Sequence, residues 1–214
     1  MSRMSRSQIP VMLTRARRCI VALVAAGPAL AFAQTTTPVV SPLVAFSGSQ
    51  TAASPVLGPD GALYGTTSTV NIVTGGLIYR LAVDGSKVNT LYQLKFDDGF
   101  SPFAGLLVGS DGLLYGMTNL GAANQVNSSG TVYRVGIDGS AFTVLHRFEN
   151  YGAVNAEGTP INADGANPEA ELVEGSDGFL YGVTRTGGSN GTGVVFKIAK
   201  DGSGFAVLHT FGAI

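Results

Sequence analysis

One phrase occurs three times in this chain of 214 residues, and it constrains the fold more than any other feature. It reads Asp-Gly-x-Leu-Tyr-Gly-x-Thr and begins at Asp60, Asp111 and Asp177. After each copy come a glycine-rich gap, an aromatic–basic pair, the triplet Asp-Gly-Ser and a Leu, always in that order. Copies that agree at so many fixed offsets identify a tandem-repeat protein. The repeats cover about 51–96, 101–148 and 167–211.

Each repeat predicts four short antiparallel strands. In the second copy we expect them at about 104–108, 113–119, 131–137 and 142–148, because apolar and polar residues alternate there, with turn residues between the runs. Both faces of these strands carry apolar residues, which suits sheets that pack on a neighbour from either side. No sustained helical period occurs within the repeats, so we expect no helix there.

The turns of the repeat have a clear chemistry, since eight of the nine Asp residues are followed by Gly. Asp-Gly between apolar runs indicates a hairpin, because Gly accepts a positive φ and Asp bonds its own backbone. In a four-stranded meander the tight turns, which join strands one and two and strands three and four, lie at the same end of the sheet. The loop between strands two and three and the connection to the next repeat lie at the other end. The copies differ at that other end, in the loop 119–130 and in an insert at 149–163. We expect ligand recognition on this variable rim.

Four antiparallel strands about every 50 residues are typical of a β-propeller blade. We therefore predict an all-β, β-propeller-like array of about three four-stranded blades, incomplete or open. The segment 43–46 repeats the Leu-x-x-Phe phrase of the fourth strand and predicts an extra strand before the first blade. Because closed propellers have about four to eight blades, the end faces of this array would meet water. Two explanations stay open: the chain belongs to a longer repeat protein, or copies self-associate through their open blade edges.

The repeated phrases resemble a known family. Asp-Gly-x-Leu-Tyr-Gly-x-Thr, Gly-x-Val-Phe-Lys and Asp-Gly-Ser-x-x-x-x-Leu-His-x-Phe, in order over about residues 43–214, are similar to the GloVer (Gloeo/Verruco) tandem repeat. This family consists of exported bacterial proteins described as choice-of-anchor proteins. The resemblance implies an exported, propeller-like repeat protein, often ending in a surface-sorting tail, and it supplies no catalytic residue. The first copy departs from the pattern, because Asp60 follows Pro55 by five residues where the later copies have nine.

The N-terminus has the features of a signal peptide. Basic residues precede an apolar run of about 13 residues at 19–31, which is short for a membrane span and suits a signal core. The run ends in Ala31-Phe32-Ala33, so we predict a signal peptide at 1–33, cleavage after Ala33, a linker at 34–42 and a repeat domain at 43–214. An uncleaved anchor is the alternative, and the Sec and twin-arginine routes both stay open. We expect export to the periplasm, the cell surface or the medium.

Charge argues against two classes of partner. After residue 33, eight basic residues face 14 acidic ones, which offers no footprint for nucleic acid or an anionic membrane. The single Cys, Cys19, leaves with the signal peptide, so the mature chain is expected to hold no disulfide and no thiolate site.

The sequence offers few candidates for chemistry. His146 and His209 occupy the same offset in two repeats, which favours a packing role over a metal or acid–base role. The Asp-Gly turns lack the carboxylate ladders of calcium-binding loops. No motif for a serine nucleophile, a phosphate loop or a zinc peptidase occurs, so we expect no catalytic residue, no metal and no cofactor. Two further series of residues recur at fixed offsets in the repeats. We expect the tyrosines to pack between blades rather than to bind sugar, and the basic residues to keep solvated heads rather than to bind an anion: Tyr64, Tyr115, Tyr181 and Arg80, Arg134, Lys197.

These observations favour an exported, non-catalytic repeat scaffold with a binding or surface-structural role. The alternatives are a propeller enzyme of lactonase or glycan lyase type, and a purely structural protein of the envelope or matrix. The ligand is unknown, and a glycan is one candidate, although the absence of Trp counts mildly against it. The residues expected to contact a ligand lie on the variable rim: Asn124, Gln125, Asn127, Tyr151, Asn155 and Glu157.

Overall fold

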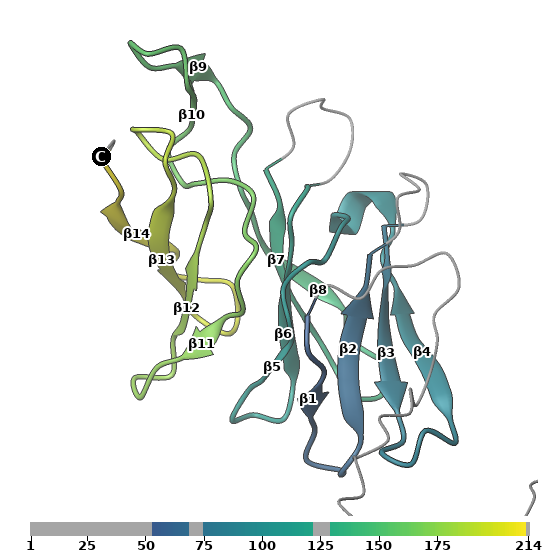
Figure 1. Cartoon of the computed structure of the whole chain (residues 1–214). Helices are drawn as coiled ribbons and strands as arrows, with labels where there is room; N and C mark the ends of the chain where they lie inside the picture. Colours follow the sequence, from purple (N-terminus) through teal and green to yellow (C-terminus); the bar gives the residue numbers. More distant parts are fainter. Residues whose placement is uncertain (1–52, 69–74, 122–128, 213–214) are drawn as a thin grey trace, which may run out of the picture. The chain divides into compact units, whose positions relative to one another are not determined.

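Three four-stranded sheets follow one another along the chain, one for each copy of the repeat (Figure 1). The computed structural model describes residues 53–68, 75–121 and 129–212, which belong to one unit spanning 41–214. Every sheet is antiparallel and keeps its strands in chain order, so the predicted all-β, propeller-like array of three blades is confirmed. The predicted signal peptide (1–33), linker (34–42) and extra strand (43–46) lie outside the described residues. Within the described residues, no helix has the length and apolarity needed to cross a membrane.

The elements have the following bounds. Blade 1 consists of β1 (Val56–Leu57), β2 (Leu63–Thr67), β3 (Leu77–Leu81) and β4 (Val88–Gln93). Blade 2 consists of β5 (Leu107–Val108), β6 (Leu114–Thr118), β7 (Thr131–Val135) and β8 (Thr143–Arg147). Blade 3 consists of β11 (Val173–Glu174), β12 (Leu180–Val183), β13 (Val194–Ile198) and β14 (Ala206–Thr210). A short helix, η1 (Phe96–Asp98), follows blade 1, and a hairpin of β9 (Ala153–Val154) and β10 (Pro160–Ile161) lies between blades 2 and 3 in the sequence.

Two details differ from the sequence prediction. The strand expected at 104–108 is reduced to the two residues of β5, and the first strands of the other blades, β1 and β11, are equally short. The helix η1 is a 3-10 turn where no helix was expected. Asp98 holds it closed, since its Oδ2 accepts hydrogen bonds from Lys95 N and Tyr92 Oη, both at 2.9 Å.

The Asp-Gly turns have the geometry that the sequence predicts. Six of them close hairpins within the described blades, and their glycines have φ between 74° and 91°. In each turn the Asp Oδ1 accepts a hydrogen bond from the backbone N–H two residues later. The turn chemistry is therefore confirmed, and it is local to each hairpin.

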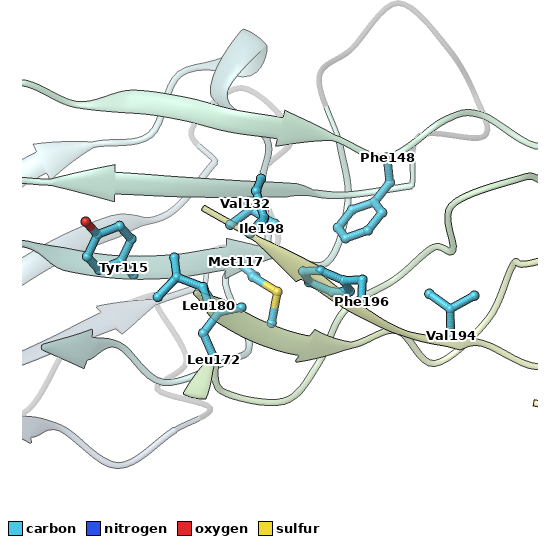
Figure 2. Close-up of a cluster of buried hydrophobic side chains, with 9 residues drawn as sticks. All are labelled: Tyr115, Met117, Val132, Phe148, Leu172, Leu180, Val194, Phe196 and Ile198. Atoms are coloured by element: carbon cyan, nitrogen blue, oxygen red, sulfur yellow. The ribbon is translucent and has the colours of Figure 1, made fainter. Parts of the chain in front are cut away.

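Each blade has two apolar faces, which we name by the neighbour they contact. The forward face carries the tyrosine of the repeat phrase and contacts the next blade; the rear face carries the aromatic residue of the third strand and contacts the preceding one. Tyr64 on the forward face of blade 1 packs with Leu114 and Tyr133 on the rear face of blade 2. The same arrangement joins blades 2 and 3 in a buried cluster (Figure 2): Tyr115, Met117, Val132, Phe148, Leu172, Leu180, Val194, Phe196 and Ile198.

A glycine in the second strand makes room for the ring on each rear face. Gly116 faces Tyr133 across the β6–β7 pair, and Gly182 faces Phe196 across the β12–β13 pair. A Cβ at either glycine would overlap the opposing ring. The glycine of the repeat phrase is therefore required by the ring that lies over it, not by a positive φ.

Rings of the fourth strand stack on rings of the next blade. Tyr92 lies 4.1 Å from Phe142 between ring centroids, with the planes 1° apart. His146, at the same offset in blade 2, lies 3.8 Å from Phe205 with the planes 8° apart. The packing role predicted for His146 is thus confirmed, since its ring forms part of the contact between blades 2 and 3.

The contact between blades 2 and 3 also contains a polar network. Glu174 of blade 3 accepts hydrogen bonds from Ser110 N at 2.8 Å and Ser110 Oγ at 2.6 Å, both in blade 2. Lys200 Nζ lies 2.6 Å from the same carboxylate, and the side chains of Lys200 and Glu174 are only 19% and 17% exposed. Lys200, followed by Ser110, lowers the pKa of Glu174 to about 2.

We expect Gly116→Ala to destabilise the fold by about 1–3 kcal/mol, because a methyl group has no space beneath the buried Tyr133 ring. Gly152→Ala is the matched control, since the space around its Cβ position is open and it should leave stability unchanged. Urea unfolding followed by circular dichroism measures both. Equal midpoints for the two variants would contradict the packing argument.

We expect acid to weaken the contact between blades 2 and 3 through Glu174. Because its pKa lies below the ordinary 4.5, this carboxylate stabilises the fold fully above about pH 4.5, and the contribution is lost as pH falls through about 2. Glu174→Gln should therefore lower the melting temperature near pH 6, and the difference should vanish near pH 2. Glu157→Gln, on an exposed carboxylate, is the control. A deficit of Glu174→Gln that persists unchanged at pH 2 would exclude the charge as its cause.

Candidate functional site

The insert between blades 2 and 3 is the part of the described rim with its own architecture. It begins after β8, forms the β9–β10 hairpin and returns to blade 3 at Asp164. The sequence predicted an extra loop here but not a hairpin. The tip of the hairpin is a turn in which Gly158 has φ 80° and its N–H donates to Asn155 O at 3.0 Å. The backbone bond of the blade turns is thus repeated, but Glu157 stands before the glycine where the blades have Asp, and Asn155 Oδ1 accepts from Glu157 N at 3.1 Å instead.

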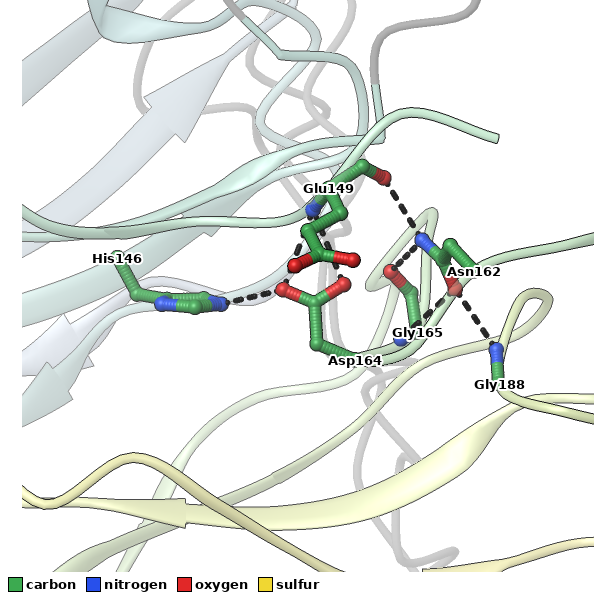
Figure 3. Close-up of polar contacts among 6 residues, drawn as sticks. All are labelled: His146, Glu149, Asn162, Asp164, Gly165 and Gly188. Atoms are coloured by element: carbon green, nitrogen blue, oxygen red, sulfur yellow. Dashed lines mark hydrogen bonds and ion pairs between the residues drawn. The ribbon is translucent and has the colours of Figure 1, made fainter. Parts of the chain in front are cut away.

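Asp164 closes the base of the insert. Its two carboxylate oxygens accept hydrogen bonds from Glu149 N at 3.0 and 3.1 Å, so the residue that follows the insert is joined to the insert's first residue (Figure 3). His146 Nε2 lies 2.8 Å from Asp164 Oδ2. The ring of His146 thus stacks on Phe205 of blade 3, and a nitrogen at its edge bonds Asp164. His146 therefore links the contact between blades 2 and 3 to the base of the insert.

Asn162 ties the insert to the loop between β12 and β13. Its Nδ2 donates to Glu149 O and Gly165 O, both at 2.7 Å. Its Oδ1 accepts from Gly165 N at 3.0 Å and from Gly188 N at 2.8 Å (Figure 3). One amide therefore uses both donors and both acceptor positions, which fixes its orientation.

Tyr151 is held by a second polar network. Its hydroxyl lies 2.7 Å from Thr186 Oγ1 and donates to Asn167 Oδ1 at 3.0 Å. Asn167 Nδ2 in turn donates to Asn119 O at 3.1 Å, at the end of β6. The hydroxyl end of the Tyr151 ring is therefore held in place by hydrogen bonds.

A shallow apolar groove lies beside this ring. It has a volume of about 400 Å³ and is lined by Tyr151, Gly152, Ala153, Val154 and Pro160. Val154 is 61% exposed, and the space around Gly152 is open. A fixed ring with small and apolar neighbours suits contact with the apolar face of a neutral ligand rather than with an ion.

The residues predicted to bind a ligand have different surroundings. Tyr151 lines the groove. Asn155 is occupied by the turn, because its Oδ1 accepts from Thr159 N at 2.8 Å and its Nδ2 donates to Asn190 O at 3.2 Å. Glu157 is exposed at the tip of the hairpin. Asn124, Gln125 and Asn127 lie outside the described residues. A ligand role for these six residues stays a prediction.

Sequence reasoning missed the residues that build the base of the insert. Asn162 and Asp164 are the two that join it, and a signal for Asp164 was present, since Asp-Gly-Ala-Asn-Pro there matches Asp-Gly-Phe-Ser-Pro at Asp98. The residue before each proline, Ser101 and Asn167, has a left-handed φ of 58° and 55°. The motif therefore marks the chain's entry into a blade. No comparable signal exists for Asn162.

The other polar candidates are engaged in structural contacts. Arg80 Nη2 lies 2.7 Å from Asp60 Oδ2 and, with the turn's own bonds, lowers the pKa of Asp60 to about 2. Arg134 Nη1 donates to Lys200 O of blade 3 at 3.1 Å. Lys197 Nζ lies 4.7 Å from the centre of the Phe179 ring. Among the described residues, no group of three or more His, Cys, Asp or Glu side chains is placed to hold a metal ion.

Comparisons with known proteins identify a repeat family. A family model described as the Gloeobacter/Verrucomicrobia repeat matches residues 28–214. No curated protein matches the chain. The solved structures that it resembles include an α-L-arabinanase from Penicillium chrysogenum (18% identity, 79% of this chain, 52% of that one, TM-score 0.49). A second is an α-L-arabinofuranosidase from Fusarium graminearum (15% identity, 78% of this chain, 50% of that one, TM-score 0.45). A third is a gluconolactonase from Xanthomonas campestris (17% identity, 77% of this chain, 48% of that one, TM-score 0.41). The chain spans about half the length of these structures.

We expect Asn162→Ala to loosen the insert without unfolding the blades, because it removes all the bonds that this amide makes. The loss of about 1–3 kcal/mol should appear locally, as faster hydrogen exchange at the amides of 149–165 and of Gly188. Asn190→Ala, which removes one exposed bond to Phe211 O, is the matched control and should leave these amides unchanged. Uniform acceleration across all three blades would show that Asn162 supports the whole fold instead.

Proposed function

The chain belongs to the Gloeobacter/Verrucomicrobia repeat family, and on that premise we propose that it is an exported, non-catalytic binding scaffold whose ligand site is the groove on the insert. The blades supply a rigid frame, and the insert at 149–163 is the recognition element. Export rests on the signal-peptide features of residues 1–33 and on the family resemblance.

The groove beside Tyr151 carries the proposal. The hydroxyl of the Tyr151 ring is held by Asn167 and Thr186. The insert that carries this ring is fixed at its base by Asn162 and Asp164. A site whose residues are held before the ligand arrives loses less conformational entropy on binding. This support distinguishes the groove from an ordinary exposed loop.

The chemistry of the groove favours binding over catalysis. Apart from Tyr151, its lining residues carry no titratable group. The nearby acid–base pair is His146 and Asp164, and the Asp164 carboxylate already accepts two backbone bonds besides the histidine. A lactonase or glycan lyase needs carboxylates and histidines that converge on the substrate. We therefore do not favour a propeller enzyme.

A neutral oligosaccharide is the ligand class that we propose to test first. Sugars present an apolar face to aromatic rings, and the Tyr151 ring lies beside a groove of about 400 Å³, a volume within the range of small-ligand sites. A protein with a purely structural role in the envelope or matrix would show no such binding.

The test is binding to an array of neutral plant and bacterial oligosaccharides, followed by titration of any hit. Ala153→Arg should weaken binding at least about tenfold, because a long cationic side chain would fill the groove. Thr90→Arg, at an exposed position of β4 in blade 1 and outside the lining, is the control for added charge and should bind like the wild type. Hits that tolerate Ala153→Arg would contradict the groove assignment, and turnover of a bound sugar would support the enzyme. An empty array together with surface localisation would favour the structural role.

A further inference from the structure

Two short segments run side by side next to Tyr151 on the variable rim. The entry to blade 3 at Ala166 and the chain after β12 at Thr186 form an antiparallel bridge, with backbone hydrogen bonds of 2.8 and 3.1 Å. Arg185 N donates a further bond to Asn167 O at 3.2 Å. The same segments supply the two side chains that hold the Tyr151 hydroxyl, those of Asn167 and Thr186. Groups carried by these segments are therefore fixed relative to that hydroxyl.

The paired segments also carry an ion pair. Arg185 Nη1 lies 3.1 Å from Glu169 Oε1. Asn119 Nδ2 donates to the same oxygen at 3.2 Å, and Asn119 is only 7% exposed. The main-chain O of Asn119 accepts from Asn167 Nδ2 at 3.1 Å. The Glu169 carboxylate is thus oriented by a buried amide and a guanidinium, and Asn119 and Asn167 link it to the Tyr151 hydroxyl.

The pair keeps hydrogen-bonding capacity on its outer side. The side chain of Arg185 is 68% exposed and that of Glu169 is 42% exposed. Among the described residues, no hydrogen bond reaches Glu169 Oε2, and the Arg185 side chain donates through Nη1 alone. One carboxylate oxygen and several guanidinium N–H groups therefore remain for a ligand, held side by side before it arrives.

We propose that the Glu169–Arg185 pair is a second subsite, which binds the hydroxyl groups of a neutral oligosaccharide whose other end lies in the groove at Tyr151. This inference rests on the proposed function. A sugar hydroxyl both donates and accepts, so it can donate to the carboxylate and accept from the guanidinium. The groove offers apolar contact, and the pair adds the directional bonds that fix a ligand's orientation.

The charges of the pair favour a neutral ligand over an ionised one. Opposite charges at 3.1 Å largely cancel toward a third group. The carboxylate of an acidic sugar that approached Arg185 would also meet the Glu169 carboxylate, and this repulsion works against acidic chains. The subsite therefore selects neutral sugars.

Two separate subsites favour a ligand longer than one sugar ring. The lining of the groove consists of Tyr151, 152–154 and Pro160, and none of these residues belongs to the segments that carry the ion pair. We expect a single ring in the groove to leave the pair uncovered, whereas a longer chain contacts both. Affinity should then rise with the number of rings, because the second contact forms within an existing complex.

The experiment is calorimetric titration with cello-, malto- and manno-oligosaccharides of increasing length, together with any other series found on the array. In a series that binds, affinity for the wild type should rise at least about tenfold from the shortest bound member to the longest. Arg185→Ala and Glu169→Ala should each abolish this rise and leave the affinity for the shortest member unchanged. Lys87→Ala, which removes an exposed charge beside the β3–β4 turn of blade 1, is the control and should keep the rise.

Acidic chains test the charge argument. Oligogalacturonates should bind the wild type more weakly than neutral chains of the same length. A preference of the wild type for oligogalacturonates would overturn the neutral subsite.

The remaining outcomes separate this subsite from the proposed function. If a series binds and Ala153→Arg weakens it, but affinity does not rise with length or rises equally in Arg185→Ala, the second subsite is wrong and the groove stands. If Arg185→Ala weakens every length equally and speeds hydrogen exchange at the Tyr151 amide, the pair only supports the groove, and the subsite is again wrong. If no series binds and the array is empty, the proposed function fails and the subsite fails with it.

Discussion

The packing of one blade face on the next is the interaction on which the rest of the structure depends. A four-stranded sheet with apolar residues on both faces cannot bury them alone, so each blade is stable only beside a neighbour. Tyr64 and Tyr115 illustrate this, since both are fully buried by the blade that follows them. Tyr181, the third member of the series, is only half-buried, because the described chain places no blade over it. Burial of this tyrosine therefore follows its position in the array, not its residue type.

The parts of the fold that sequence predicts well are those with local causes. The Asp-Gly turns follow from the φ of the glycine and the reach of the Asp side chain, which both lie within four residues. The insert could not be predicted in the same way, because the partners of Asn162 include Gly188, which lies 26 residues further along the chain. The pattern also assigned Asn155 to a ligand, although its amide closes a turn. A polar residue in a variable loop has the same sequence signature whether it binds a ligand or its own backbone.

The two blade contacts are built differently, and the difference fixes the order of the blades. Val108 and Ile137 make the first contact apolar. Glu174 and Lys200 stand at the same offsets in blade 3, and Ser110 satisfies the carboxylate. Blade 1 has Pro59 where blade 2 has Ser110. Since proline lacks both the N–H and the hydroxyl, blade 3 packed on blade 1 would bury a carboxylate without these bonds. Near-identical repeats thus still specify one arrangement.

The support of the insert explains how a repeat protein can vary its rim without losing its frame. Buried or partly buried bonds fix the insert at its base: Asp164 bonds Glu149 and His146, and Asn162 bonds Gly188. At the tip, Asn155 adds one exposed bond to Asn190 O. Because His146 stacks on Phe205, the base belongs to the contact between blades 2 and 3, so the groove keeps its position as long as those blades stay packed. Residues at the tip and along the groove can then change with little effect on folding, which is the condition under which new binding specificities arise on a fixed scaffold.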